Sequence, residues 1–454
     1  MIPAMPAPGA TATLCKFLAE RRAEDFPSDV RRAARRGLLD WIGCALAGSD
    51  HPSLQPLLKV LTRFSGQPVA TVFGNQKKLG IMEASTANGY MGHVLDFDDT
   101  HLGGTILHTS SPVLGALLAL AEAQQLSGRD FLTGYICGFE AGIRCGQAAP
   151  RHHDGGWHLT GTLGCLAAGV ATGVALRLDE RRLNHALGIA ATQAAGLQQN
   201  RGTMCKYLHA GKAASGGLLS GLLAQEGFDS ALDVIEGKQG FSKIYSDTSV
   251  PERLVSDLGV QWEITRNGYK PYASAAVLHP IVDAMREIHL AARGTGTAPT
   301  AANVDSIELK LSPYAMSIAG VRVPESGMQS KFSVFHTAAV ALLDADGGVT
   351  QYDDARVRDP AVISLRDKVK VSIIENFRKE QCAATVMISG KPFHATIEHA
   401  TGTANNPMAD DRLAAKFYAN AERVIGRAHA ERIAGMVNEL EFLPDMAELS
   451  RLCA

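Results

Sequence analysis

The chain has 454 residues, of which 46% are hydrophobic and 20% are charged. This composition is that of a globular protein with a large buried core, and the length predicts two or three domains. The formal net charge of −2 at pH 7 gives the chain no field that would attract nucleic acid or an anionic membrane. A small anionic substrate would therefore need cations placed locally in its pocket.

The cysteines and the first residues bear on the compartment. None of the eight cysteines forms a Cys-x-x-Cys pair, and most lie in apolar helical stretches, which is typical of reduced thiols in a cytosolic protein. The first twenty residues lack a basic start followed by an apolar run, so we expect no signal peptide and a cytoplasmic protein. Residues 162–178 are apolar but shorter than the ~20 residues that span a bilayer, which predicts a buried helix.

Residues 1–265 are patterned for helices. Residues 27–48 begin with Ser28 as an N-cap and then place apolar side chains at helical spacing. The same pattern, rich in Ala and Gly, returns in residues 110–125, 129–147, 162–177, 180–199 and 209–226. Residues 1–265 therefore predict an all-helical domain.

The pattern changes after residue 265. Residues 306–312 and 368–373 alternate apolar and polar side chains, and residues 384–399 predict two strands around a Gly-Lys-Pro turn. Helical patterns lie among these strands, so residues 266–404 predict a smaller α+β unit. Residues 405–454 return to a helical pattern, which we expect to rejoin the first domain. The predicted fold is mainly α, with one large helical domain built from both ends of the chain.

The stretch "GHVLDFDDTHLGGTILHTSS", residues 92–111, concentrates acids and imidazoles among apolar residues. A calcium loop starting at Asp96 fails, because His101 stands at the glycine position and Leu107 at the closing glutamate position. The HExxH helix or Cys/His cluster of a zinc site does not occur. Another metal held by His101, His108 and Asp98 or Asp99 stays open, and so does helix capping by either aspartate. The whole cluster has more ionisable groups than capping requires.

Further polar groups stand at the ends of apolar elements. His158 precedes a helix start, and Lys206 and Lys212 lie in "GTMCKYLHAGKAASGG" before a helix rich in small residues. Lys270 lies where the helical pattern ends, and Tyr314 follows a predicted strand. Each residue has a plain alternative, such as a structural histidine or a lysine that extends to solvent. Together they provide cations, imidazoles and a phenol without a phosphate loop or nucleotide signature.

The order of these motifs resembles that of the MmgE/PrpD family. The blocks are "DFDDTH", "HLTGTLG", "KYLHAGKAA" and "YKPY" followed by "HP", and "NPMADDRLAAKF" is similar to the family's C-terminal helix. The resemblance covers essentially the whole chain. It implies a large helical domain with a smaller α+β lid, a homodimer, and a site between the domains that needs no metal or cofactor.

Site residues follow from the matching positions. The resemblance implies catalytic roles for Asp96, His108, His158, Lys206, Lys270 and Tyr314, and substrate binding by Thr100, Lys206 and Lys270. The decarboxylase branch of the family has a further histidine after the junction lysine, where this chain has Ala275. His279 comes later and is followed by Pro280.

The family acts next to carboxylates, where removal of a proton from carbon builds negative charge that lysines can stabilise. We therefore predict a cofactor-independent lyase that dehydrates a small di- or tricarboxylate, such as 2-methylcitrate, by acid–base catalysis. The alternatives are an epimerase of an iminodisuccinate-like substrate and a cis-aconitate-type decarboxylase. A non-enzymatic binding module would leave the polar clusters unexplained.

Overall fold

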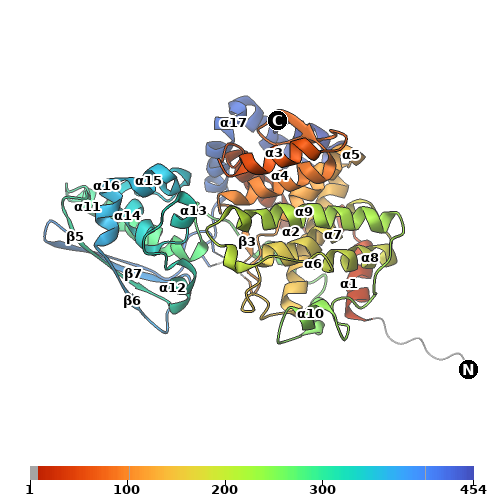
Figure 1. The fold of residues 1–454 in the computed structure, drawn as a ribbon, viewed down its shortest axis with the longest axis horizontal. Coiled ribbons are helices and arrows are strands. Elements are labelled where there is room, and N and C mark those ends of the chain that lie inside the picture. Colours follow the sequence, from red (N-terminus) through yellow and green to blue (C-terminus); the bar gives the residue numbers. More distant parts are fainter. Residues whose placement is uncertain (1–8, 102, 404) are drawn as a thin grey trace, which may run out of the picture.

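The computed structural model describes residues 9–101, 103–403 and 405–454, and it has two parts that lie side by side (Figure 1). The larger part, here called the helical body, contains α1 (Ala10–Ala19), α2 (Ser28–Ala47), α3 (Leu54–Phe64), α4 (Ile81–Val94), α5 (Ser110–Gln124), α6 (Gly128–Ala148), α7 (Leu159–Ala175), α8 (Glu180–Ala191), α9 (Met204–Gln225), α10 (Phe241–Ile244), α17 (Asp410–Asn438) and α18 (Ala447–Leu452). The fold is mainly α, as predicted.

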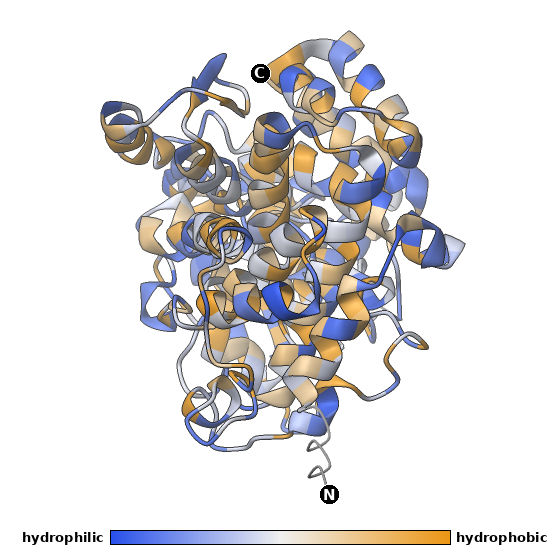
Figure 2. Ribbon diagram, turned by 90° about the vertical axis from the view of Figure 1, so that its right-hand side faces the viewer, coloured by the Kyte–Doolittle hydropathy of each residue, from blue (hydrophilic) through white to orange (hydrophobic). Residues whose placement is uncertain are grey.

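The centre of the helical body is a group of closely packed helices rich in small residues. Every residue of α7 is buried, which confirms the helix predicted for the apolar stretch that begins at residue 162. A Cβ atom at Gly217 of α9 would come within 2.6 Å of the backbone nitrogen of Gly169 in α7, so only glycine allows this approach. Figure 2 shows hydrophobic segments gathered on the central helices. Among the described residues, no helix is long and apolar enough to cross a membrane.

The C-terminal helices pack on the N-terminal part of the helical body. Lys416 of α17 donates to Asp40 of α2 at 2.8 Å, and Phe417 is fully buried against Gly43. The two parts of the molecule have separate hydrophobic cores, one in the helical body and one in residues 272–397. The domain boundary at 265 stays a prediction, and the boundary at 404 falls on a residue outside the described ones.

The smaller part, here called the lid, is a four-stranded sheet covered by helices. Its strands are β5 (Val304–Leu311), β6 (Val369–Ile373), β7 (Cys382–Ile388) and β8 (Lys391–Ile397), in the order β6-β5-β7-β8, with β5 and β6 parallel and the other pairs antiparallel. The helices are α11 (His279–Gly294), α12 (Pro313–Ala319), α13 (Gly327–Ser330), α14 (Val334–Asp344), α15 (Asp354–Arg358) and α16 (Pro360–Asp367). The β7–β8 turn is Ser389-Gly390, both at positive φ, so the turn precedes the Lys-Pro pair expected in it.

Two short ribbons complete the helical body, and one of them positions the site. The first joins β1 (Ala70–Val72) to β2 (Lys77–Leu79). The second pairs β3 (Thr100–His101) with β4 (Asn267–Gly268), so that Thr100 lies opposite Gly268. This pairing brings the acidic stretch after α4 next to the segment that leads into the lid.

Candidate active site

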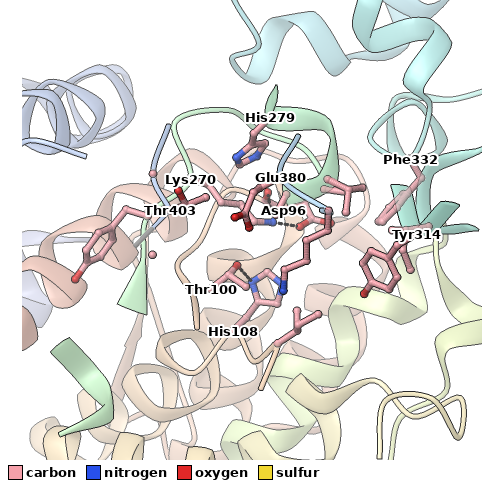
Figure 3. A pocket seen from close by; sticks show the side chains of 18 of the residues that line it. Asp96, Thr100, His108, Lys270, His279, Tyr314, Phe332, Glu380 and Thr403 are labelled. Carbon is pink, nitrogen blue, oxygen red and sulfur yellow. Dashed lines mark hydrogen bonds and ion pairs between the residues drawn. The ribbon is translucent and has the colours of Figure 1, made fainter. Parts of the chain in front are cut away.

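A cavity of about 120 Å³ lies where the helical body meets the lid (Figure 3). All seven residues predicted for the site line it: Asp96, Thr100, His108, His158, Lys206, Lys270 and Tyr314. They come from the loops after α4 and before α5, the starts of α7, α9 and α12, and the segment after β4. The structure therefore brings together residues that are widely separated in the sequence.

Asp96 lies between two lysines. Lys206 and Lys270 each donate to its carboxylate, and Lys270 also donates to its backbone oxygen at 3.0 Å. Burial alone would raise the pKa of Asp96, but the two lysines outweigh it and hold that pKa well below its usual range. Asp96 also has a positive φ of 53°, a conformation uncommon outside glycine. Within this trio two cations share one carboxylate, which leaves positive charge for an anionic ligand.

His108 is held through one ring nitrogen. Its Nδ1 lies 2.9 Å from the backbone oxygen of Asp99, 3.1 Å from Thr100 Oγ1 and 3.3 Å from Asp98 Oδ1. A carbonyl oxygen can only accept, so Nδ1 carries the proton and donates it. The other nitrogen, Nε2, is then the unprotonated one in the neutral ring. It can accept a proton from a bound molecule.

His158 stands at the start of α7 beside a second imidazole. Its Nδ1 lies 2.9 Å from Nδ1 of His209, so one ring donates and the other accepts. Burial and then the charge of Lys206 lower the pKa of His158 well below its usual range, so the ring is neutral at neutral pH. Its side chain caps no backbone amide within the described part of the chain, so the capping role of a histidine at this position does not apply.

Tyr314 lies on the lid side of the cavity (Figure 3). Burial raises the pKa of its phenol, so the hydroxyl keeps its proton at neutral pH and can donate it. Ile318 and Phe332 of the lid line the same cavity. The lid thus contributes a phenol that can donate a proton, next to two apolar side chains.

Comparison with known proteins identifies the family. The MmgE/PrpD N-terminal domain matches residues 12–254, and the MmgE/PrpD C-terminal domain matches residues 272–441. The chain belongs to the MmgE/PrpD family. It is 31% identical to a cis-aconitate decarboxylase of Aspergillus terreus (strain NIH 2624 / FGSC A1156), over 98% of this chain and 96% of the relative. The cis-aconitate decarboxylases of Mus musculus and Homo sapiens are 27% and 26% identical, over 93% of this chain and 88% and 90% of theirs. These relatives are lyases.

The structure of this MmgE/PrpD protein also separates site residues from their neighbours in the motifs. His101 lies outside the cavity, where its Nε2 is 3.0 Å from Glu263 and its Nδ1 is 3.1 Å from the Thr105 backbone oxygen. Lys212 is exposed on α9, as expected for a lysine that extends to solvent. Asp98 and Asp99 accept from the hydroxyls of Ser111 and Ser110, so their carboxylates bind side chains where helix capping would bind backbone amides.

Two cations and a further histidine of the cavity were not predicted. His153, Arg201 and Lys379 line it, and neither Arg201 nor Lys379 forms an ion pair with a described residue. Arg201 follows α8 in a loop, and Lys379 lies in the charged run between β6 and β7, where no local motif marks it. His279 and Glu380 line the cavity as well. Their place depends on how the MmgE/PrpD lid sits on the helical body.

Among the described residues, one group of side chains offers the ligand atoms for a metal ion. His93, Asp98 and His108 each offer a ligand atom within 4.8 Å of the others, whereas His101 is bound to Glu263. A metal ion bound through the Nδ1 atoms would require both imidazoles to lose the Nδ1 proton. The Nδ1 atoms face carboxylate and carbonyl oxygens that need that proton as a hydrogen-bond donor. The donor chemistry therefore fits a hydrogen-bonded network better than a metal centre.

Proposed function

We propose that this MmgE/PrpD protein is a cofactor-independent lyase that acts on a small di- or tricarboxylate beside one of its carboxylates. The proposal rests on Asp96 held between Lys206 and Lys270 in a cavity that also contains His108 and His158. A substrate carboxylate would bind the two lysines as a charge-assisted pair. The unpaired cations Arg201 and Lys379 suit a second carboxylate of the same molecule.

The reaction begins with proton removal from carbon. His108 Nε2 takes the proton, and the electron pair of the broken C–H bond moves toward the neighbouring carboxylate, where Lys206 and Lys270 stabilise the added charge. A C=C bond then forms as the C–O bond to a hydroxyl breaks. Tyr314 gives its proton to the leaving hydroxyl, which departs as water. Neutral His158 holds the substrate by a hydrogen bond.

Dehydration of a hydroxy-polycarboxylate such as 2-methylcitrate is our first candidate. It is supported by Ala275, which lines the cavity where the decarboxylase branch of the family has a histidine. Decarboxylation of a cis-aconitate-like substrate is the second candidate, supported by the names of the relatives. In that case His108, in its protonated form, or Tyr314 would supply a proton to carbon as CO₂ leaves. Epimerisation of an iminodisuccinate-like substrate would use two opposed proton acceptors.

One assay in deuterated buffer separates these reactions. The protein is incubated with 2-methylcitrate, citrate and cis-aconitate, and products are followed by proton NMR together with CO₂ release. An unsaturated product without CO₂ establishes dehydration, and stoichiometric CO₂ establishes decarboxylation. Deuterium uptake without loss of water or CO₂ shows that a proton is removed from carbon and returned, which favours epimerisation. A protein that binds these acids and converts none of them would be a binding module, and the lyase proposal would fail.

The quaternary state and location also stay predictions. We propose a homodimer, which light scattering across a dilution series would test, with a monomer mass at every concentration contradicting it. All eight cysteines lie in the described part of the chain and are free thiols, which supports a cytoplasmic location.

A further inference from the structure

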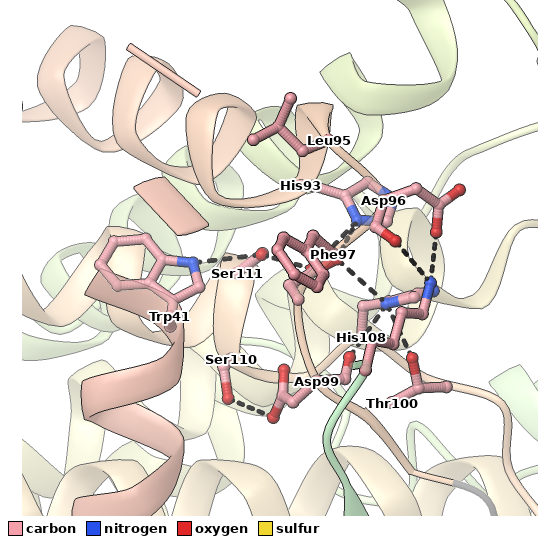
Figure 4. A network of polar contacts seen from close by, with 12 residues as sticks. Trp41, His93, Leu95, Asp96, Phe97, Asp99, Thr100, His108, Ser110 and Ser111 are labelled. Atoms are coloured by element: carbon pink, nitrogen blue, oxygen red, sulfur yellow. Dashed lines mark hydrogen bonds and ion pairs between the residues drawn. The ribbon is translucent and has the colours of Figure 1, made fainter. Parts of the chain in front are cut away.

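Beside the cavity lies a buried network of polar contacts that includes His93, His108 and Ser111 (Figure 4). Asp98 contacts all three of them. His93 Nδ1 lies 3.0 and 3.1 Å from its two carboxylate oxygens, and His108 Nδ1 lies 3.3 Å from Oδ1. Ser111 donates its hydroxyl to Oδ2 at 2.6 Å, and Trp41 Nε1 donates to Ser111 at 3.1 Å. Asp98 and His93 have no exposed surface and do not line the cavity. They are outside the residues assigned to substrate.

Asp98 is charged in this setting. Burial would raise its pKa, but the contacts with His93 and His108 outweigh burial and place that pKa well below the usual range. Burial lowers the pKa of His93 to about 4, so His93 is a neutral ring that donates its Nδ1 proton to the carboxylate. A buried carboxylate of this kind is costly unless donors surround it. Its charge is directed at the two imidazoles.

The network reaches two histidines of the cavity, His108 and His158. The His93 ring lies 4.6 Å from that of His108 and is stacked at 5.6 Å on that of His158, measured between ring centroids. The Nε2 atom of His93 is buried and has no hydrogen-bond partner among the described residues. The His93 ring thus packs against the rings of His108 and His158, while its Nδ1 donates to Asp98.

We propose that Asp98 is a positioning residue for His108, which it holds together with the Asp99 backbone oxygen, with Nδ1 protonated and Nε2 directed to the substrate. When His108 accepts a proton, the carboxylate also stabilises the cation that forms. His93 and Ser111 hold that carboxylate in place. This inference rests on the proposed function, in which His108 is the base.

Several charged or titratable groups face His108, and they define the expected pH effect. Asp98 and Asp96 lie on the same loop, His93 comes from α4, His158 from α7 and Lys206 from α9. Loss of the Asp98 charge makes protonation of His108 harder. The acid limb of the kcat/KM profile should therefore move to lower pH, while the plateau falls because the base is weaker and the Asp99 backbone oxygen alone then holds its tautomer.

The test compares Asp98→Asn with Asp99→Asn. Both carboxyls are fully buried on one loop, but that of Asp99 binds Ser110 and Asn267 and touches no imidazole. We expect Asp98→Asn to lower kcat by ~10²-fold with a small change in KM, because a positioned base contributes about that much or more. Asp99→Asn should stay within about threefold of the original enzyme. Equal kcat and pH profiles for both variants, with only the melting temperature lowered, would overturn the inference.

A milder pair covers the case in which Asp98→Asn does not fold. Ser111→Ala removes one donor to Asp98, and Ser110→Ala removes the equivalent donor to Asp99. Only Ser111→Ala should lower kcat and shift the acid limb, and equal behaviour of the two variants would count against Asp98. Nitrogen NMR of labelled histidine, assigned with His108→Gln, reports the tautomer without substrate. If His108 is fully Nδ1-protonated in the original protein and a mixture of tautomers in Ser111→Ala, the inference is supported even when no polycarboxylate is converted. The same tautomer population in both proteins refutes it.

Discussion

The two walls of the cavity differ in kind. The wall from the helical body holds Asp96, Thr100, His108 and Lys206, which are buried and bound to one another or to the loop behind them. The wall from the lid combines apolar side chains, among them Val277, Ile318 and Phe332, with the polar groups of Tyr314, His279, Lys379 and Glu380 (Figure 3). Proton transfer needs fixed groups, whereas exclusion of water needs a fitted apolar surface. In the proposed reaction the helical body supplies the base and the carboxylate clamp, and the lid supplies the enclosing apolar surface together with Tyr314 and Lys379.

The largest loss should come from the wall of the helical body. His158→Ala should lower turnover by roughly 10²-fold, with little change in melting temperature, because the ring holds the substrate in line with His108. The control is His101→Ala, because His101 is buried outside the cavity and pairs with Glu263. That variant should lose stability and keep its turnover per folded molecule. A folded His158→Ala protein with near-native turnover would show that the site is wrongly assigned.

A smaller effect is expected from the carboxylate clamp. Lys206→Ala removes one of the two cations at Asp96 and should raise KM by about 10- to 100-fold, which corresponds to loss of a charge-assisted hydrogen bond. Steady-state kinetics would measure it. Lys212→Ala, an exposed lysine on the same helix, is the matched control and should leave KM unchanged. A fall in kcat at constant KM would instead mean that the charge is used only in the transition state.

The lid wall should respond more weakly still. Ile318→Ser places a hydroxyl on the apolar side and should lower kcat/KM by about 3- to 10-fold, because the enclosure then admits water more readily. Val323→Ser, at a position 60% exposed on the same lid, should have no effect. Equal losses of kcat/KM in Ile318→Ser and His158→Ala would contradict the different roles of the two walls.

Lys331 contacts both the helical body and the lid, and it gives a pH-dependent effect on stability in place of turnover. Its ammonium group is buried and donates to the backbone oxygens of Leu95 and Ala273, both at 2.7 Å. Burial lowers the pKa of Lys331 to about 7. Above that pH the unfolded chain holds this proton and the folded chain does not, so the stability due to this group rises with pH, by at most about 1.4 kcal/mol per unit.

The measurement compares unfolding of the native chain with that of Lys331→Met between pH 7 and pH 9. The native chain should gain stability relative to the variant as the pH rises. The exposed Lys16→Met variant should show no such difference. Parallel stability curves for the native chain and Lys331→Met would contradict the assignment.

Local pattern explains which parts of the fold and site could be predicted. The helix that contains residues 162–175 has a continuous apolar sequence, and the cluster around Asp96 stands out because charges are rare beside such helices. By contrast, Arg201 and Lys379 lie in polar loops, where cations are common. That they line the cavity becomes clear only once the lid is placed on the helical body. Lys331 looks like an ordinary surface lysine in the sequence. Its burial depends on two carbonyl groups from distant segments.

The capping hypothesis for Asp98 and Asp99 was wrong for a related reason. Sequence alone places both aspartates near a helix start, where binding to backbone amides is common. Only the fold shows that the two carboxylates instead accept hydrogen bonds from the hydroxyls of Ser111 and Ser110. The expected turn after β7 included Lys391 and Pro392, but these two residues already belong to β8. Ser389 and Gly390, both at positive φ, make the reversal.

The return of α17 to α2 has a consequence for synthesis. The ribosome completes α2 at residue 47, but its partner α17 begins only at residue 410, after the whole lid has emerged. Until then the side of α2 that carries Gly43 lacks the buried Phe417 that covers it, and Asp40 lacks the lysine that pairs with it. A nascent chain halted before residue 410 would expose this apolar strip and an unpaired acid, which is the kind of surface that chaperones bind. The helical body can therefore reach its final packing only late in translation, although its first helices are among the earliest residues made.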